Sequence, residues 1–386
     1  MGVQNAIDTR ALAQRIKAAH KPIVENFFNE RALLKLAEKS IKWNGSHTEF
    51  DWFVRNVPTG ETATFGNPDG ELNVLTFEEQ KPANKASLPY CYLTKTYGVG
   101  ERTMEANRNA DSNKIFDVVK ENMKLAQIFM YDALGPSIYN KNETSEDPVG
   151  LLAAVGNPIN TAGVAVVAAG ASYAGRTLKT TVSSTVGDCL YRKAASVVAK
   201  GWDDPQWAPL VGSVEGVLAA AGSALTQWST GCINALAYMA EEMSITASIS
   251  GTGTRIKPDI ALMNSSPYAA LRNKLIAGQA AGYMIPLGRS DLILAGFPNV
   301  IVDTLACIKD TDVPSDTNTI PEERVFVLDS KQFNIMTTHK KSEGIIKSEF
   351  DPDVAIIAGV VGRLQANLAY MLTSPTAAGC IVGCND

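Results

Sequence analysis

A helical period of apolar residues over positions 111–134 is the clearest pattern in the chain. Apolar side chains recur there every three or four positions, with charged residues on the opposite face, which is typical of a helix packed on one side. Gly135 and Pro136 follow, and both residue types are common at helix ends. The predicted helix is about 36 Å long at about 1.5 Å per residue, so we expect a structural spine. Its expected buried face consists of Ile115, Val118, Val119, Ala126, Phe129, Met130 and Ala133.

From His47 onward the pattern changes to short alternating segments. Residues 48–79 alternate polar and apolar positions and are interrupted by turn-forming glycines and prolines. This pattern predicts a long two-stranded hairpin. An isolated hairpin is marginally stable in water, so we expect this one to rest on another chain. Residues 88–99 then indicate a more buried strand.

The second half of the chain has a mixed helix and strand pattern. An amphipathic helix is predicted in CINALAYMAEEM, followed by a buried strand in KPDIALMN and another strand in FPNVIVD. Between the two strands, Ser265 or Ser266 is expected to cap a helix that has Pro267 at its first position. Further strands are predicted at 323–329, 333–339, within 351–372 and at 377–383.

Two regions give weaker signals. The first 45 residues have helical patterns and more basic than acidic side chains. Docking onto a partner subunit is our main interpretation of them, and contact with nucleic acid is the alternative. Residues 136–228 are rich in small side chains, and no topology is predicted for them.

Composition and charge exclude several classes of protein. With 386 residues, 45% hydrophobic and 19% charged, the chain can bury a large core and is not of the disordered type. A net charge of −5 gives no general attraction to phosphate, so avid DNA binding is not expected. The first 20 residues lack the apolar core of a signal peptide. The uncharged stretches 148–175 and 216–240 carry too many polar groups to span a membrane.

No catalytic or metal-binding constellation is found in the sequence. His20, His47 and His339 are far apart, and phosphate loops, dinucleotide fingerprints and nucleophile elbows are missing. We therefore expect neither enzymatic activity nor a metal or other cofactor. The six scattered cysteines indicate a reducing compartment. Cys380 and Cys384 are interpreted as free surface or interface thiols, with an intersubunit disulfide as the alternative.

The order of these elements resembles that of the major capsid proteins of tailed bacteriophages, which have the Hong Kong 97 fold. In that family an N-terminal arm leads to an extended loop, a peripheral domain with a long spine helix, an axial domain, and a return through the peripheral domain. The resemblance covers about three quarters of the chain and leaves residues 136–228 unmatched. The segments that carry it are WFVRNVPTGETATFGNPDGELNVLTFEE, LPYCYLTKTYGV with the helix after it, INALAYMAEEM, PDIALMNSSPYAALRN, GFPNVIVD, the stretch 348–375 and GCIV.

The resemblance implies an α+β fold of the Hong Kong 97 type. The implied domains are an N-terminal arm at 1–47, an extended loop at 48–88, a peripheral domain at 89–155 and 321–373 with the spine helix at 111–134, and an axial domain at 156–320 and 374–386.

Two departures from the family pattern have chemical consequences. Some members join subunits through a lysine on the extended loop and an asparagine of a neighbour, with a glutamate as base. Here residues 55–79 contain no lysine and residues 351–372 no glutamate, although Asn367 is present, so we do not expect this cross-link. The arm of about 45 residues is too short for a fused scaffolding domain, so a separate scaffolding protein is implied.

The function implied by the resemblance is that of a major capsid protein, which assembles as hexamers and pentamers of an icosahedral head around double-stranded DNA. Implied partners are further copies of the chain, a portal, the scaffolding protein and decoration or cement proteins. DNA would be held only by weak non-specific contact, and no membrane is involved. The expected location is the virion, after assembly in the host cytoplasm. The alternatives are an encapsulin-like compartment shell and an unrecognised α/β hydrolase.

Large apolar side chains on a projecting hairpin have no intrachain core to enter, so we expect them to contact neighbouring subunits. These residues are Trp52, Phe53, Phe65, Leu75 and Phe77. Arg55 and Glu61 are expected to pair across subunits.

Overall fold

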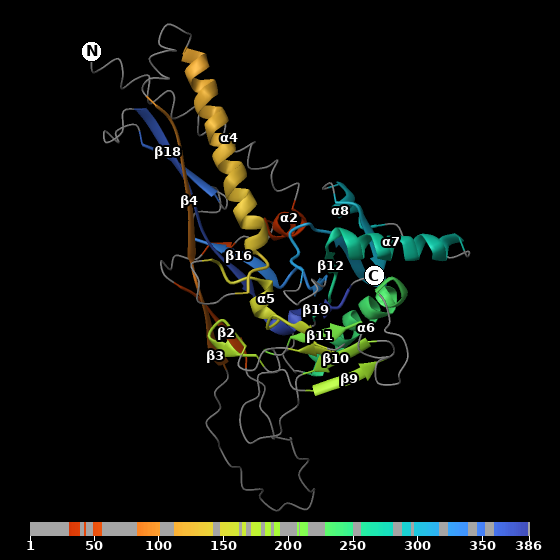
Figure 1. Cartoon of the computed structure of the whole chain (residues 1–386). Helices are drawn as coiled ribbons and strands as arrows, with labels where there is room; N and C mark the ends of the chain where they lie inside the picture. The colour runs from red at the N-terminus through yellow and green to blue at the C-terminus, as the bar shows by residue number, and fades with distance from the viewer. Residues whose placement is uncertain are drawn as a thin grey trace, which may run out of the picture.

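Two large β-sheets, each accompanied by helices, make up most of the described part of the chain and meet at one end of the long helix α4 (Figure 1). Three two-stranded sheets, β2–β3, β5–β6 and β7–β8, complete it. The computed structural model describes residues 31–38, 42–43, 49–55, 83–100, 112–141, 147–161, 164–166, 171–178, 182–186, 189–193, 207, 209–214, 228–249, 256–280, 288–294, 297–315, 323–338, 346–351 and 359–384. A mixed arrangement of helices and strands confirms the α+β class.

The first sheet has five strands and supports the long helix. Its longest strand, β18 (Gly359–Leu372), pairs antiparallel with β4 (Cys91–Gly100), β17 (Ile346–Asp351) and β16 (Phe333–Thr337), and β1 (Lys42–Trp43) joins β16 in parallel. Helix α4 (Ser112–Ser137) lies along β4, and Figure 1 shows both projecting from the rest of the molecule beside β18. The Asn122 amide donates to the Gly98 carbonyl over 2.8 Å and joins helix to strand.

The predicted spine helix is confirmed, with two corrections. It does not stop at Gly135 but continues to Ser137, whose hydroxyl donates to the Leu134 carbonyl over 2.8 Å and satisfies the last turn. Phe129 and Ala133 were expected in the buried face and are exposed. The buried residues are Val119, Met123, Ala126, Gln127, Met130, Tyr131 and Leu134.

The second sheet has eight strands. Their order is β13 (Asn299–Val302), β14 (Leu305–Lys309), β12 (Ile260–Met263), β15 (Val325–Leu328), β19 (Ala378–Val382), β11 (Leu210–Ser213), β10 (Cys189–Lys193) and β9 (Val182–Val186). Strands β12, β15 and β19 at its centre are buried throughout. The helices α6 (Trp228–Ile249), α7 (Ser265–Ala280) and α8 (Ser290–Leu294) accompany this sheet.

Most elements predicted for this half of the chain are confirmed, and three details are corrected. The cap of α7 is Asn264, whose side-chain oxygen accepts from the Ser265 amide over 2.7 Å. Strand β14 was not predicted, and it is the parallel partner of β12. Helix α7 begins at Ser265, so Pro267 is its third residue and not its first. Strand β15 belongs to the eight-stranded sheet and β16 to the five-stranded sheet.

The region without a predicted topology supplies short elements. They are α5 (Leu151–Ala154), β5 (Ile159–Thr161), β6 (Val164–Val166), β7 (Ser172–Tyr173), β8 (Arg176–Thr177) and the strands β9 to β11, which end at the β9 edge of the eight-stranded sheet. Near the start of the chain lie α2 (Ala32–Glu38) and the paired strands β2 (Glu49–Arg55) and β3 (Ala83–Pro89). A 3₁₀ turn at Pro375–Ala377 precedes β19.

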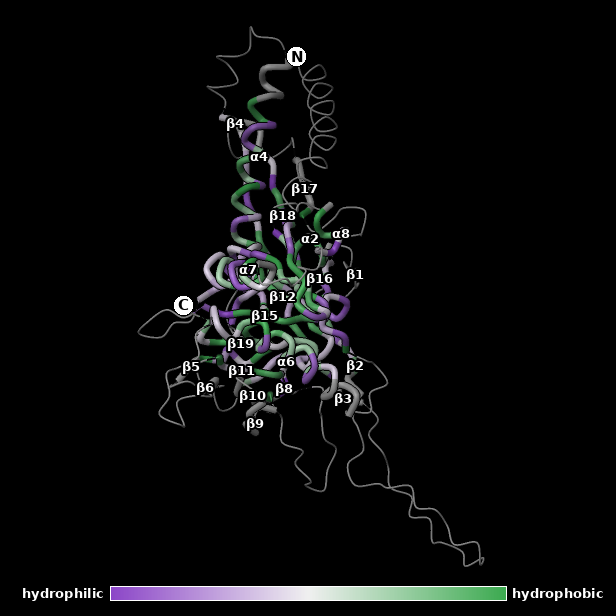
Figure 2. The backbone as a smooth tube through the Cα atoms, turned by 90° about the vertical axis from the view of Figure 1, so that its right-hand side faces the viewer, coloured by the Kyte–Doolittle hydropathy of each residue, from purple (hydrophilic) through white to green (hydrophobic). Residues whose placement is uncertain are grey.

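Hydrophobic residues gather where the sheets and helices pack together, and Figure 2 shows them in green through the central strands. Cys380 and Cys384 are part of this interior, with 0% and 1% of their surface exposed, and neither is part of a disulfide. The interpretation as surface thiols is therefore wrong, and their burial argues against an intersubunit disulfide. Among the described helices, none is both long and apolar enough to cross a membrane.

Candidate assembly surfaces

The paired strands β2 and β3 form the root of the predicted hairpin, in the register Glu49 opposite Pro89 to Arg55 opposite Ala83. Side chains alternate across β2 as expected for a strand. Phe50 is buried, whereas Phe53 on the other face is 80% exposed. On that outer face Lys85 makes a 2.9 Å ion pair with Asp51, which raises the lysine pKa through the hydrogen bond to the carboxylate. The root therefore has one face in the core and one apolar side chain facing outward.

Trp52 fixes this root to the body of the chain. Its ring stacks on Phe50 at 5.7 Å and lies 6.5 Å from Tyr173 and 6.3 Å from Trp207, measured between ring centroids. The indole nitrogen of Trp52 donates to the Thr373 carbonyl over 3.2 Å. Four segments distant in sequence thus meet at one aromatic cluster, which anchors strand β2 to the body of the chain.

The predicted contact residues therefore divide into four groups. For Trp52 the expected reason for a subunit contact does not hold, because its partly buried side chain packs against the intrachain core, and its contact with a neighbour stays a prediction. Phe53 is exposed as the prediction requires, and its contact with a neighbour stays a prediction. Arg55 is the last residue of β2. Glu61, Phe65, Leu75 and Phe77 lie outside the described residues.

A second exposed apolar surface lies on α4 and was missed in the sequence. Leu125 and Phe129 are 52% and 58% exposed, and their spacing of four places them side by side on the helix. The Lys95 ammonium lies 5.0 Å from the centre of the Phe129 ring, in a cation–π contact. We call these three residues the spine face. The apolar period of the helix could not distinguish this exposed face from the buried face, because both faces carry large apolar side chains.

The side chain of Asn367, the residue type used in the family cross-link, is 9% exposed and engaged within the chain. Its amide nitrogen donates to the Thr338 hydroxyl over 3.1 Å, and its oxygen accepts from Gln365 over 3.4 Å. Both ends of the amide are thus occupied by intrachain hydrogen bonds.

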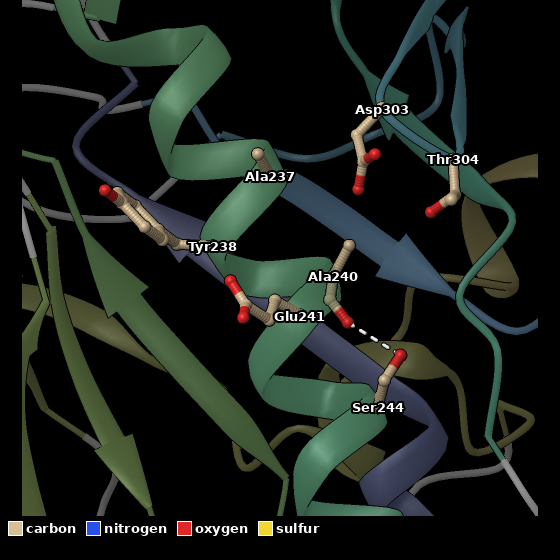
Figure 3. A pocket seen from close by; sticks show the side chains of 7 residues that line it. All are labelled: Ala237, Tyr238, Ala240, Glu241, Ser244, Asp303 and Thr304. Atoms are coloured by element: carbon tan, nitrogen blue, oxygen red, sulfur yellow. Dashed lines mark hydrogen bonds between the residues drawn. The ribbon is translucent and has the colours of Figure 1, made fainter.

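A surface hollow of about 450 Å³ lies between α6 and the turn that joins β13 to β14 (Figure 3). Glu241 and Ser244 line it from the helix, and Asp303 and Thr304 from the turn. The Ser244 hydroxyl donates to the Ala240 carbonyl of its own helix over 3.0 Å, and no histidine is among the lining residues. This arrangement does not activate a nucleophile. Among the described residues no three His, Cys, Asp or Glu side chains gather to hold a metal ion.

Comparison with solved structures identifies the fold. The chain matches a structure described as the cyanophage A-1(L) capsid asymmetric unit with a TM-score of 0.57 and 15% sequence identity, over 92% of this chain and 93% of that one. The capsid of Myoviridae phage XM1 matches with a TM-score of 0.45 and 10% identity, over 91% and 92% of the two chains. The holo-SrpI encapsulin complex from Synechococcus elongatus PCC 7942 matches with a TM-score of 0.43 and 10% identity, over 78% and 76%.

No protein-family model and no curated protein matches the sequence. The likeness to the cyanophage A-1(L) capsid protein extends over nearly the full length of both chains and shows a shared fold. The tailed-phage capsid fold expected from the order of the elements is therefore confirmed.

Proposed function

We propose that this chain is the major subunit of a tailed-phage head. Copies of it assemble as hexamers and pentamers into an icosahedral shell that encloses double-stranded DNA. In this proposal the five-stranded sheet with α4 belongs to the peripheral domain, and the eight-stranded sheet belongs to the axial domain. The shell forms in the host cytoplasm and becomes part of the virion. A portal, a separate scaffolding protein and decoration or cement proteins are the proposed partners.

The observation that carries the proposal is the exposure of large apolar side chains on a chain with the capsid fold. Among the described residues, Phe53, Leu125 and Phe129 are each more than half exposed, and Tyr92, Ile276 and Ile293 are exposed as well. Exposed apolar groups on a firmly anchored hairpin and on a rigid helix are suited to bury area against another copy. A shell multiplies such contacts, because each subunit uses the same surfaces with several neighbours.

The net charge of −5 supports DNA as contents that are held weakly. A strongly positive lining would bind the phosphate backbone and prevent it from sliding during packaging. An encapsulin-like shell with a protein cargo is the competing function. The two differ in contents, so nucleic acid or protein recovered from particles made in the native host separates them.

Electron microscopy of the purified chain, with the candidate scaffolding protein where needed, tests the proposal. Shells, tubes, hexamers or pentamers are expected. Phe53→Ala and Phe129→Ala should each raise the protein concentration needed for assembly about tenfold, since truncating a contact residue costs roughly 1–2 kcal/mol per interface. Thr94→Ala, an exposed residue on β4, is the control and should assemble like the wild type. A chain that remains monomeric under all conditions would contradict the proposal.

A further inference from the structure

The C-terminal end of α4 is the point where the two sheets are joined. On one side the Tyr370 hydroxyl of β18 lies 2.9 Å from the Ser137 hydroxyl and donates to the Leu134 carbonyl over 3.3 Å. On the other side the Tyr139 hydroxyl donates to the Asp310 carboxylate over 2.9 Å, directly after β14 of the eight-stranded sheet. The orientation of α4 relative to the eight-stranded sheet is therefore decided at this junction.

Arg31 spans the junction with one guanidinium group. It forms an ion pair with Asp312 in the loop after β14, and a second one of 3.1 Å with Asp132 on α4. The backbone at Arg31 is held in place because α2 begins at the next residue. Four side chains of α2 are buried, namely Ala32, Leu33, Leu34 and Ala37.

The arrangement depends on a cation between carboxylates. Asp312 donates its backbone amide to the Asp310 carboxylate over 3.0 Å, so both acidic residues lie near Arg31, whose second ion-pair partner is Asp132 of α4. Burial raises the pKa of Asp310, and Arg31 acts in the opposite direction. Without Arg31 the two sides of the junction would repel each other, because like charges at short range destabilise the contact.

Gly135 gives the guanidinium room to cross the helix. A Cβ atom at this position would overlap the Arg31 guanidinium and the Asp312 carboxylate. Glycine inside a helix is normally less favourable than alanine, so its presence here is explained by this close approach.

We propose that Arg31 is a positioning residue that sets the angle of α4 relative to the eight-stranded sheet, and through this angle the curvature of the assembled shell. The role in curvature rests on the function proposed above. Helix α4 has 26 residues and is about 39 Å long. A rotation of about 5° at its base therefore moves its far end by about 3 Å, which is enough to change which atoms meet in a packed interface.

The test uses Arg31→Ala, Gly135→Ala and Arg31→Lys, with Arg289→Ala as the matched control. Arg289 makes a 3.0 Å ion pair with Asp259, in which Asp259 directly precedes β12 and Arg289 directly precedes α8. Gly135→Ala keeps Arg31 in the chain but displaces its guanidinium group. Because alanine is more favourable than glycine inside a helix, this variant does not weaken helix α4 itself. Lysine can neutralise one carboxylate but lacks the fork that reaches two, so Arg31→Lys should lie between wild type and Arg31→Ala.

The first readout is the distribution of particle diameters in electron micrographs. Arg31→Ala and Gly135→Ala should give particles of altered or mixed curvature, whereas Arg289→Ala should give wild-type particles. Arg31→Ala leaves both Asp312 and Asp132 without their ion-pair partner. Adding Asp312→Asn removes the less exposed of these two charges and should restore part of the wild-type distribution. Diameters that are the same for Arg31→Ala and Arg289→Ala would overturn the role in curvature.

The second readout does not depend on assembly. Hydrogen exchange of the unassembled chain should be about tenfold faster in Arg31→Ala than in wild type for residues 131–137 and 309–313, as expected for the loss of charge-assisted bonds. Arg289→Ala should leave both segments unchanged. Unchanged exchange in Arg31→Ala would overturn the positioning role itself. If the wild type forms no shell but hydrogen exchange responds to Arg31→Ala as expected, the proposed function fails, whereas the positioning role of Arg31 within the chain is retained.

Discussion

Replacement of Trp52 by alanine should destabilise the fold, whereas replacement of its neighbour Phe53 should not. Trp52 has three aromatic neighbours with ring centroids between 5.7 and 6.5 Å away, and its indole donates to the Thr373 carbonyl. Phe53 is 80% exposed on the opposite face of the same strand. The two residues differ in burial and not in chemical class, so they form a matched pair.

The expected magnitude follows from the partial burial of Trp52. Core tryptophan-to-alanine changes cost about 3–5 kcal/mol, and the lower end applies to a partly buried ring. About 1 kcal/mol of this comes from the lost hydrogen bond. An unfolding entropy of about 2.1 cal/mol/K per residue corresponds to about 0.8 kcal/mol/K for the whole chain of 386 residues. A loss of about 3 kcal/mol should therefore lower the melting temperature by about 4 °C.

Thermal unfolding of the unassembled chain, followed by calorimetry, measures this shift. Trp52→Phe keeps an aromatic ring but loses the bond to Thr373, so a decrease of about 1 °C is expected. Phe53→Ala should stay within 1 °C of wild type, roughly the scale of an exposed substitution. Equal melting temperatures for Trp52→Ala and Phe53→Ala would refute the assignment of Trp52 as the intrachain anchor.

Three further predictions concern the interior. Gly362→Ala should destabilise the fold by about 1–3 kcal/mol, because the added Cβ meets the Tyr97 ring. At Gly100 an added Cβ has open space around it, so Gly100→Ala should not show this loss. The melting temperatures of the two variants test the difference. Iodoacetamide should label the half-buried Cys91 of the native chain and spare the four buried cysteines, Cys232, Cys307, Cys380 and Cys384. Mass spectrometry measures the labelling of each residue. Labelling of the four at the rate of Cys91 would contradict their burial. Burial raises the pKa of Asp310 above its usual 3.8, so the folded chain holds this proton more tightly than the unfolded chain. Relative to Asp310→Asn, the wild type should therefore lose stability as the pH rises from 3.8 through the raised pKa, and its stability should change no further above that pKa. Denaturant midpoints of the two proteins, measured across this pH range, test the expectation. The opposite slope would show that the carboxyl is stabilised in its charged form.

The elements that could be predicted are those whose pattern is complete within one segment. Helix α4 has its apolar period within 26 residues, and β12 is a short apolar run between turn residues. Strand β14 was missed although a local signal exists. Asp303 and Thr304 separate two apolar runs, and Asp303 has a φ of 53°, which is the backbone conformation that tight hairpins require.

Contacts that join distant segments could not be predicted in this way. Trp52 was assigned no intrachain core because Tyr173 and Trp207 lie in the region without a readable period. The Arg31–Asp312 pair joins residues 281 positions apart, and no local pattern links them. Both cases follow from the same limit, because periodicity describes which face of an element is apolar and not what that face meets.

The exceptions to the periodicity are informative in themselves. An apolar period on a helix predicts burial, and burial was wrong at Phe129 while Leu125 beside it is also exposed. Such a side chain loses the stabilisation that a core position would provide, so a fold selected only for its own stability has no use for it. A chain that must associate with copies of itself does have a use for it, because the area left uncovered in one subunit is buried in the assembly. On this argument the positions where the helix pattern wrongly predicts burial are the positions that serve the proposed function. The cation–π contact of Lys95 with Phe129 holds one such side chain in position before another copy binds.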